Sequence, residues 1–344
     1  MKTLKKMMGM LLVLVMFFTL SAVADAAEEP TYNWIFNATM KSSEMDTNPG
    51  GMAIQYFNEQ VQERSNGQIK ITMYTDGQLA NSTDEVVTGA LSDSFQLFNM
   101  PIGNLGGYTD AFRALDVPYL FLNSEQVYEM MDSGLGDSMK EEAIEDCGLR
   151  ILTYLDLGFR QMTNSVRPIK TPDDLPGIKF RVMATDYQIA LFENFGCGTV
   201  TTAYSELYSA LQQGLVDGQD NPITNVYTGK LYETQKYLTL TNHNYTFTSI
   251  SISDSAFQSL TPELQEMVLE VAREAELLCR EKYAALEADY LEELSNSLEI
   301  YEPTTEELEA FKEKATGIWP MMEEAFGEEY WNYLMDLSAE VLGG

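Results

Sequence analysis

The sequence predicts an α/β protein built as two lobes. Three observations support this prediction: short apolar runs alternate with amphipathic stretches, one helical stretch is long enough to reach across two domains, and no linker rich in proline or glycine divides the chain. Hydrophobic residues make up 45% of the 344 residues, which is enough to fill real cores and excludes a disordered chain. We therefore expect two lobes joined by ordered crossings.

The N-terminal part of the predicted fold has the order strand, helix, strand. Residues 32–36 and 68–74 are apolar runs of strand length, and the amphipathic stretch 52–64 between them ends before Gly67. A unit of this kind brings its two strands together in parallel. The pattern predicts the beginning of a mostly parallel sheet with helices on its faces.

Later segments extend the same sheet. Ser82 and Glu85 have the spacing of a capping box, which predicts the start of a second short helix. Residues 94–99 and 149–155 have the length and composition of further strands.

A long helix is predicted after residue 260. Thr261 is a suitable N-cap, Pro262 suits the first helical position, and apolar residues continue at a helical period as far as Leu294. A helix of more than 30 residues would be about 45 Å long, which is more than one small domain needs. We expect it to run across both lobes and brace them.

The N-terminus has the pattern of a secretory signal. Three lysines precede an apolar run over residues 10–20, and Ala24 and Ala26 supply the small residues of a cleavage site, so we predict a signal peptide over residues 1–26. The apolar run is too short for the roughly 30 Å of a membrane interior, so we expect no membrane insertion of the mature chain. An uncleaved anchor is the alternative. Export of this kind indicates a periplasmic protein.

Composition excludes several function classes. The chain has 53 acidic against 21 basic residues, a net charge of -32, which disfavours nucleic acid as a partner. It contains a single histidine, His243, and three cysteines, Cys147, Cys197 and Cys279, so common zinc and haem sites cannot be assembled. We expect no metal and no cofactor. The three cysteines allow at most one disulfide bond.

Enzyme signatures are absent from the sequence, including GxSxG, GxxxxGK[ST], GxGxxG and HExxH. His243 lacks a recognisable catalytic partner, and we interpret it as a structural, hydrogen-bonded residue. We therefore expect a protein that is not an enzyme. A secreted hydrolase is kept as the alternative from another class.

Two arginines are candidate binding residues. Residues 158–245 carry seven basic and eight acidic side chains, and within this nearly neutral segment Arg160 and Arg181 alternate with apolar neighbours on strand-like runs. A buried guanidinium needs a carboxylate, which either the protein or a ligand can supply. Composition alone favours a partner within the protein.

Several ordered blocks of the sequence resemble a known family. The blocks are LDVPYLF (115–121), GFRQMTNS (158–165), PDDLPGIKFRV (172–182), YSELYSALQQGLVDGQDNP (204–222), YETQKYL (232–238) and TNH (241–243). They are similar to the extracytoplasmic solute-binding proteins of tripartite ATP-independent periplasmic (TRAP) transporters, the DctP-like family. Two departures are Asp220, where the family usually has glutamate, and residues 196–202, which replace a run containing alanine and proline.

The resemblance implies a periplasmic-binding-protein fold with a cleft between two α/β lobes and a long lobe-spanning helix. It implies an N-terminal lobe over residues 27–157 with about 247–286, and a C-terminal lobe over 158–246 with about 287–344. The implied function is non-catalytic capture of a small organic acid and delivery to the integral membrane permease subunits of a TRAP transporter.

The resemblance also assigns site residues position by position. Arg181 matches the arginine that pairs with the substrate carboxylate, and Arg160 matches a second arginine that contacts the ligand. Asn221 matches an amide that hydrogen-bonds the ligand, and Tyr204 matches an aromatic residue that lines the cleft. A planar guanidinium suits a carboxylate because it offers two parallel donors.

The ligand class is less constrained by the sequence. Tyr204, Asn221 and Asn225 favour a sugar acid such as a uronate, whereas a four-carbon dicarboxylate or another carboxylate is the alternative. Both asparagines and the tyrosine are equally consistent with turn-capping and core roles. Further contacts are predicted at strand ends and loops of the N-terminal lobe. These residues are Asn37, Gln78, Glu85 and Asn99.

Overall fold

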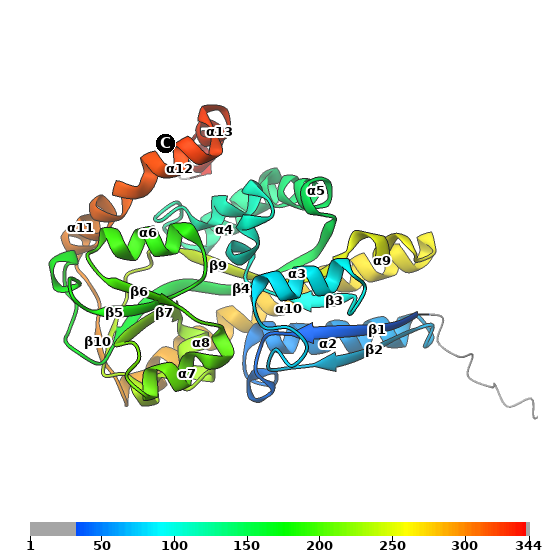
Figure 1. Ribbon diagram of the computed structural model, residues 1–344, viewed down its shortest axis with the longest axis horizontal. Helices are drawn as coiled ribbons and strands as arrows, with labels where there is room; N and C mark the ends of the chain where they lie inside the picture. Colours follow the sequence, from blue (N-terminus) through cyan, green and yellow to red (C-terminus); the bar gives the residue numbers. More distant parts are fainter. Residues whose placement is uncertain (1–31, 342–344) are drawn as a thin grey trace, which may run out of the picture.

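The computed structural model describes residues 32–341, and the predicted signal peptide lies outside them. Figure 1 shows strands running through the centre of the molecule with helices packed around them. The elements up to the longest strand are β1 (Tyr32–Ala38), α2 (Pro49–Arg64), β2 (Ile69–Tyr74), α3 (Thr83–Leu91), β3 (Leu97–Asn99), α4 (Ser124–Met130), α5 (Gly136–Cys147) and β4 (Leu149–Asn164).

The second part of the chain repeats short strands and helices before it returns to the first part. Its elements are β5 (Lys179–Val182), α6 (Asp186–Asn194), β6 (Gly198–Thr201), α7 (Tyr204–Gln212), β7 (Gly218–Pro222), α8 (Ile223–Thr228), β8 (Tyr237–Thr239) and β9 (Tyr245–Ser253). The C-terminal elements are α9 (Asp254–Gln258), α10 (Pro262–Ser295), β10 (Glu299–Tyr301), α11 (Thr305–Ala315), α12 (Trp319–Phe326) and α13 (Glu328–Val341).

The sheet is mixed, with two parallel regions joined by antiparallel strands. Its strand order is β2-β1-β3-β9-β4-β7-β5-β6. Strands β1, β2 and β3 pair in parallel at one end, and β5, β6 and β7 pair in parallel at the other. Between them, β4 and β9 run antiparallel to each other and to their neighbours. The prediction of a mostly parallel sheet was therefore wrong for its centre, where two strands cross between the parallel regions in opposite directions.

Strand β4 connects the two ends of the sheet. Its first part pairs with β9, and its last five residues pair with β7. The sequence suggested a strand at 149–155 and a separate strand-like run around Arg160, and the structure joins both in one strand of 16 residues. The pairing with β9 shifts register at Asp156/Gly158, so the strand is irregular where it passes from one partner to the next.

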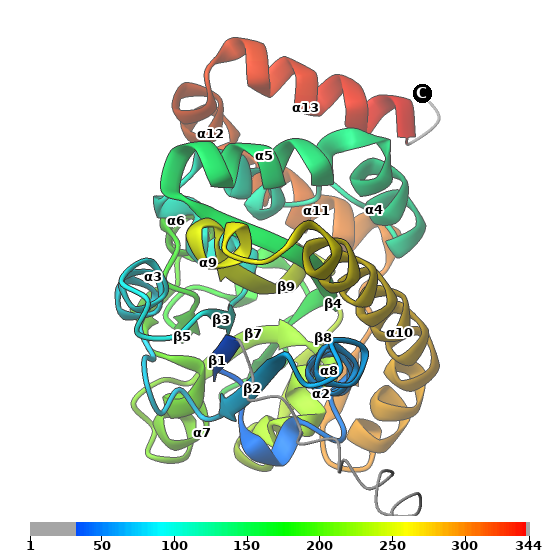
Figure 2. The same cartoon turned by 90° about the vertical axis from the view of Figure 1, so that its right-hand side faces the viewer.

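Helix α10 braces the two ends of the sheet, as predicted. It begins after the N-cap Thr261, whose side chain accepts a hydrogen bond from Leu264 N, and has Pro262 at its start and 34 residues in all. Figure 2 shows it along one side of the molecule beside α2. It contacts α2 and β4 and also reaches α8 in the second part of the chain. The helix is longer than one core needs, and its extra length lets it contact both parts of the chain.

The two largest apolar clusters among the described residues hold most of these elements together. One fills the space between α2, the first strands and the beginning of α10, with Phe57 and Val271 fully buried. The larger one joins both parts of the chain, because it contains Phe98 from β3, Phe180 from β5 and Leu334 from α13. The three cysteines are free thiols. Among the residues described, no helix is both long and apolar enough to cross a membrane.

Gly158 lies where α10 packs against the irregular part of β4. Its φ angle is 104°, and an added Cβ would lie 2.2 Å from the hydroxyl oxygen of Tyr283 on α10, a side chain that is itself buried. Both the backbone conformation and the close approach therefore require glycine here.

We predict that Gly158→Ala destabilises the protein more than Gly177→Ala does. Gly177 also has a positive φ, 82°, but an added Cβ would meet nothing within 4 Å. Gly177→Ala, the control, should lower the free energy of unfolding by about 1 kcal/mol through backbone strain. Gly158→Ala should lower it by about 2 kcal/mol more because the Tyr283 ring must move. Urea unfolding of both variants measures the difference, and equal losses would show that the contact with Tyr283 imposes no constraint.

Candidate ligand-binding site

A cavity of about 280 Å³ is lined by residues from both ends of the sheet. Its walls include the ends of β3, β5 and β7, the middle of β4 and the start of α7. The carboxyl ends of parallel strands are a common place for ligand sites because backbone and side-chain donors converge there. Six of the nine predicted site residues line this cavity. They are Asn99, Arg160, Arg181, Tyr204, Asn221 and Asn225.

Arg181 is a buried guanidinium without a carboxylate partner. It lies on β5, its side chain is 5% exposed, and no salt bridge to it occurs among the residues described. Its Nε and Nη2 both donate to the Thr202 carbonyl oxygen, at 3.1 and 2.6 Å. A guanidinium has five N–H donors, so the edge formed by Nη1 and Nη2 keeps donors to spare. Burial, and next the charge of Arg160, lower the pKa of Arg181 to about 10.

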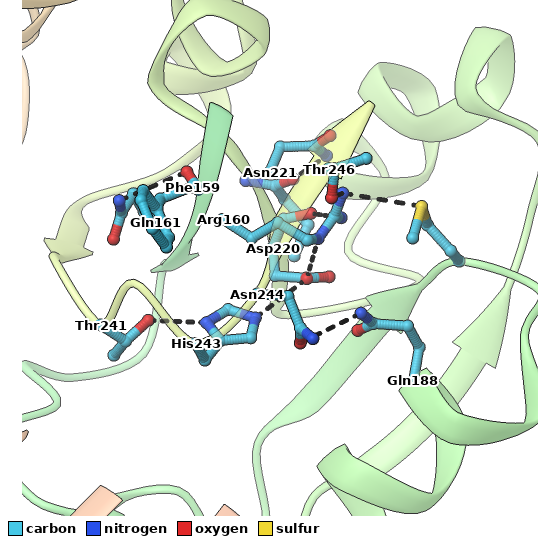
Figure 3. Close-up of polar contacts among 12 residues, drawn as sticks. Phe159, Arg160, Gln161, Gln188, Asp220, Asn221, Thr241, His243, Asn244 and Thr246 are labelled. Carbon is cyan, nitrogen blue, oxygen red and sulfur yellow. Dashed lines mark hydrogen bonds and ion pairs between the residues drawn. The ribbon is translucent and has the colours of Figure 1, made fainter. Parts of the chain in front are cut away.

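Arg160 differs because it already has a partner within the protein. Figure 3 shows its guanidinium directed at Asp220, with Nε 2.5 Å from Oδ2. Nη2 also donates to the main-chain oxygen of Asp220, and Nη1 lies 3.5 Å from Thr246 Oγ1. Burial alone would raise the pKa of Asp220, but the charge of Arg160 and hydrogen bonds from His243 and Arg160 hold it far below its usual value. The pair is therefore ionic, and a partner within the protein is correct for Arg160 but not for Arg181.

His243 is buried beside the Arg160–Asp220 ion pair and contacts the same carboxylate. Its Nε2 lies 3.2 Å from Asp220 Oδ2 and its Nδ1 2.8 Å from Thr241 Oγ1 (Figure 3). Burial lowers its pKa despite the nearby carboxylate, so the ring is neutral. A neutral ring that donates from Nε2 to Asp220 must accept at Nδ1 from the Thr241 hydroxyl. The prediction of a structural, hydrogen-bonded histidine is confirmed.

Asn221 and Asn225 of the cavity wall belong to a chain of hydrogen-bonded amides. Asn221 Nδ2 donates to Gln219 Oε1, Asn225 Nδ2 lies 3.5 Å from Asn221 Oδ1, and Asn48 Nδ2 donates to Asn225 Oδ1 at 3.0 Å. Asn48 is the N-cap of α2, so this chain joins the two ends of the sheet. On the other side Asn99 Oδ1 accepts from Thr39 N at 2.8 Å. These amides present oriented donors and acceptors to the cavity.

Three predicted site residues lie outside the cavity. Asn37 is fully buried on β1 and donates to the Ala80 carbonyl oxygen at 3.0 Å. Gln78 is exposed in the turn after β2. Glu85 closes the predicted capping box of α3, where its Oε2 accepts from Ser82 N at 3.1 Å. The expected position at a strand end or in a loop is correct for Asn37 and Gln78 but not for Glu85, which lies in the first turn of α3. Local hydrogen bonds or exposure keep all three out of the cavity lining.

One family is identified by comparison with known proteins. The family model of the bacterial extracellular solute-binding proteins, family 7 (DctP), matches residues 40–325. The chain belongs to this family. Family 7 consists of solute-binding transport proteins and not enzymes, so the resemblance seen in the sequence and the expectation of a non-enzyme are confirmed and the hydrolase alternative is excluded.

Relatives within family 7 differ in the solutes for which they are named. The chain is 33% identical to the 2,3-diketo-L-gulonate-binding periplasmic protein YiaO of Escherichia coli over 65% of its own length and 68% of that protein. Among solved structures, a TRAP periplasmic solute-binding protein from Sulfitobacter sp. NAS-14.1 with bound β-D-galacturonate has a TM-score of 0.82 at 26% identity, covering 90% of this chain and 99% of that chain.

Another similar solved structure contains a dicarboxylate. It is a TRAP periplasmic solute-binding protein from Sulfurospirillum deleyianum with bound succinate, with a TM-score of 0.81 at 28% identity over 91% of this chain and 99% of that chain. The two-lobed α/β fold expected from the sequence is that of these neighbours.

Among the cavity residues that sequence reasoning missed is the acidic Glu44. It ends the short helical turn η1 (Ser42–Glu44), is 1% exposed and lines the cavity, where both carboxylate oxygens lie near the Tyr204 hydroxyl, at 3.2 and 3.3 Å. In a chain with 53 acidic residues, no pattern distinguishes a buried carboxylate from the many exposed ones.

We predict that replacing the two cavity arginines changes the stability of this family 7 protein by very different amounts. Arg160→Met leaves Asp220 buried without its guanidinium, which should cost about 3 to 5 kcal/mol. Arg181→Met removes a buried charge that has no ionic partner, so the free energy of unfolding should change by less than about 1 kcal/mol. Denaturant unfolding without added ligand compares them, and similar losses for both would show that Arg181 has a structural partner of equal importance.

Proposed function

We propose that the protein captures a sugar acid, such as a uronate, by its carboxylate and delivers it unchanged to the membrane permease of a TRAP transporter. The observation that carries this proposal is Arg181, a buried guanidinium in the wall of the cavity with no carboxylate beside it. Because an unpaired buried charge is unfavourable, the site favours a ligand that brings a carboxylate to it. A planar guanidinium with two parallel donors matches the two oxygens of a carboxylate.

The charged and polar groups of the cavity wall favour a sugar acid over a dicarboxylate. Arg160 is already neutralised by Asp220, so one guanidinium is open to a ligand and not two. The remaining polar wall is largely neutral, with the amides of Asn99, Asn221 and Asn225 and the Tyr204 hydroxyl. Such groups match the hydroxyl groups of a sugar ring. The relatives named for 2,3-diketo-L-gulonate and crystallised with galacturonate support this choice.

A four-carbon dicarboxylate is the second candidate. The relative with bound succinate favours it, at an identity similar to that of the galacturonate-bound one. Nη1 of Arg160 also has only long contacts, 3.5 Å to Thr246 Oγ1 and 3.6 Å to Met183 Sδ, so it retains donor capacity that a second ligand carboxylate would accept.

The division into lobes is part of the proposal. We propose that residues 27–157 with about 247–286 form one lobe, residues 158–246 with about 287–344 form the other, and the two close on the ligand. Contacts between these groups support this, because Asn48 donates to Asn225 and Asn81 Nδ2 lies 3.0 Å from Ser205 Oγ. The basic and apolar pattern of residues 1–26 supports export to the periplasm, where a permease partner would receive the ligand.

We predict that Arg181→Ala abolishes high-affinity binding of D-galacturonate. Losing one partner of a buried ion pair should cost about 2 to 5 kcal/mol, or roughly 30-fold to several thousand-fold in affinity. Arg181→Lys should also weaken binding because an ammonium group cannot reproduce the two parallel donors. Titration calorimetry at constant pH and salt measures both.

Lys179→Ala is the matched control for this prediction. Lys179 is exposed on the same strand and does not line the cavity, so its loss removes the same charge without touching the site. Its affinity should equal that of the wild type. Unchanged affinity in Arg181→Ala would remove Arg181 from the site, whereas a wild type that binds succinate and no sugar acid would favour the second candidate.

A further inference from the structure

Glu44 is the one acidic side chain among the described residues that line the cavity. It comes from the loop between β1 and α2, whereas Arg160, Arg181 and Tyr204 come from the second part of the chain. The cavity therefore has a guanidinium in need of a carboxylate on one side and a buried carboxylate from the other end of the sheet. An anionic ligand must meet both groups.

The Glu44 carboxylate has few donors for its oxygens. The Tyr204 hydroxyl is shared between the two oxygens, and Lys41 Nζ lies 4.0 Å from Oε1, beyond hydrogen-bond distance. An ionised carboxylate can accept about four hydrogen bonds. Burial is the largest influence and raises the pKa of Glu44 to about 7; Lys41 and Tyr204 oppose this rise, and Asp76 adds to it. More donors are needed to stabilise its charge.

Packing holds the carboxylate in place. The main-chain oxygen of Glu44 accepts from Asn48 N at 2.8 Å, which ties the turn to the start of α2. Gly229 lies against the carboxylate, where an added Cβ would be 2.6 Å from the Tyr204 hydroxyl oxygen and 3.2 Å from Glu44 Oε1. The side chain is thus confined between Tyr204 and a residue that has no side chain of its own.

We propose that Glu44 makes the site select a ligand with one carboxylate and several hydroxyl groups over a dicarboxylate. This inference rests on the proposed capture of a carboxylate by Arg181. A ligand hydroxyl near Glu44 would donate to its unfilled oxygens, and a hydrogen bond to a charged acceptor is roughly twice as strong as a neutral one. A second ligand carboxylate would instead meet a like charge on the ionised form of the buried Glu44 side chain.

The variant Glu44→Gln tests the charge without removing the contact. Glutamine has the same shape and keeps an oxygen that can accept from Tyr204, so the link between the two ends of the sheet is retained. Titration calorimetry with D-galacturonate and with succinate gives the ratio of the two affinities. We expect galacturonate to bind more weakly and succinate more tightly, with a change in the ratio of about tenfold or more.

Glu85→Gln is the matched control. Glu85 is an exposed carboxylate outside the cavity, and glutamine also serves in a capping box, so the ratio should stay at the wild-type value. An unchanged ratio in Glu44→Gln, together with binding that is lost in Arg181→Ala, would overturn this inference and leave the proposed function standing. If the wild type binds neither ligand, the proposed function itself fails.

Discussion

Asp220 is fully buried and forms an ion pair with only one of the two guanidinium groups that line the cavity. Its Oδ2 contacts both Arg160 Nε and His243 Nε2, and the Thr241 hydroxyl contacts the other ring nitrogen of the histidine. This arrangement neutralises Arg160 and leaves Arg181 with a main-chain oxygen as its acceptor. The cavity wall therefore contains one guanidinium, that of Arg181, with no ionic partner in the part of the chain that the structure describes. This unpaired positive charge is what makes the cavity suited to a carboxylate.

The strands β4, β7 and β5 explain why Asp220 pairs with Arg160 and leaves Arg181 without a carboxylate. Arg160 lies on β4 where the strand pairs with β7, the strand that carries Asp220, so the two side chains are positioned by neighbouring backbone hydrogen bonds. Arg181 lies on the next strand, β5, which pairs with β7 near Gln219. These three adjacent strands place Asp220 in an ion pair with Arg160, and no salt bridge joins Asp220 to Arg181 among the residues described. Helix α10 and the contact at Gly158 hold β4 in its path.

Much of this frame could be predicted from the sequence because local signals specify it. Thr261 and Pro262 marked the start of α10, and Ser82 with Glu85 marked that of α3. The antiparallel course of β4 and β9 was missed, since an apolar run does not record the direction of its neighbours. The continuity of β4 was missed for a related reason, because its irregularity at Gly158 resembles a break between strands.

The binding site could be predicted only in part. Arg181, Tyr204 and Asn221 were assigned by resemblance, and the structure brings them to one cavity. The pairing of Arg160 with Asp220 depends on strand register, which spacing along the chain does not reveal. Glu44 carries no local signal that separates it from exposed acids, and its burial arises from contacts with Tyr204 and Gly229, far away in sequence.

A crystal structure of the protein with D-galacturonate would test the central claim most directly. The account predicts both ligand carboxylate oxygens within about 3 Å of Nη1 and Nη2 of Arg181, while Arg160 stays paired with Asp220. A ligand whose carboxylate lies elsewhere, with Arg181 still donating only to Thr202, would contradict it.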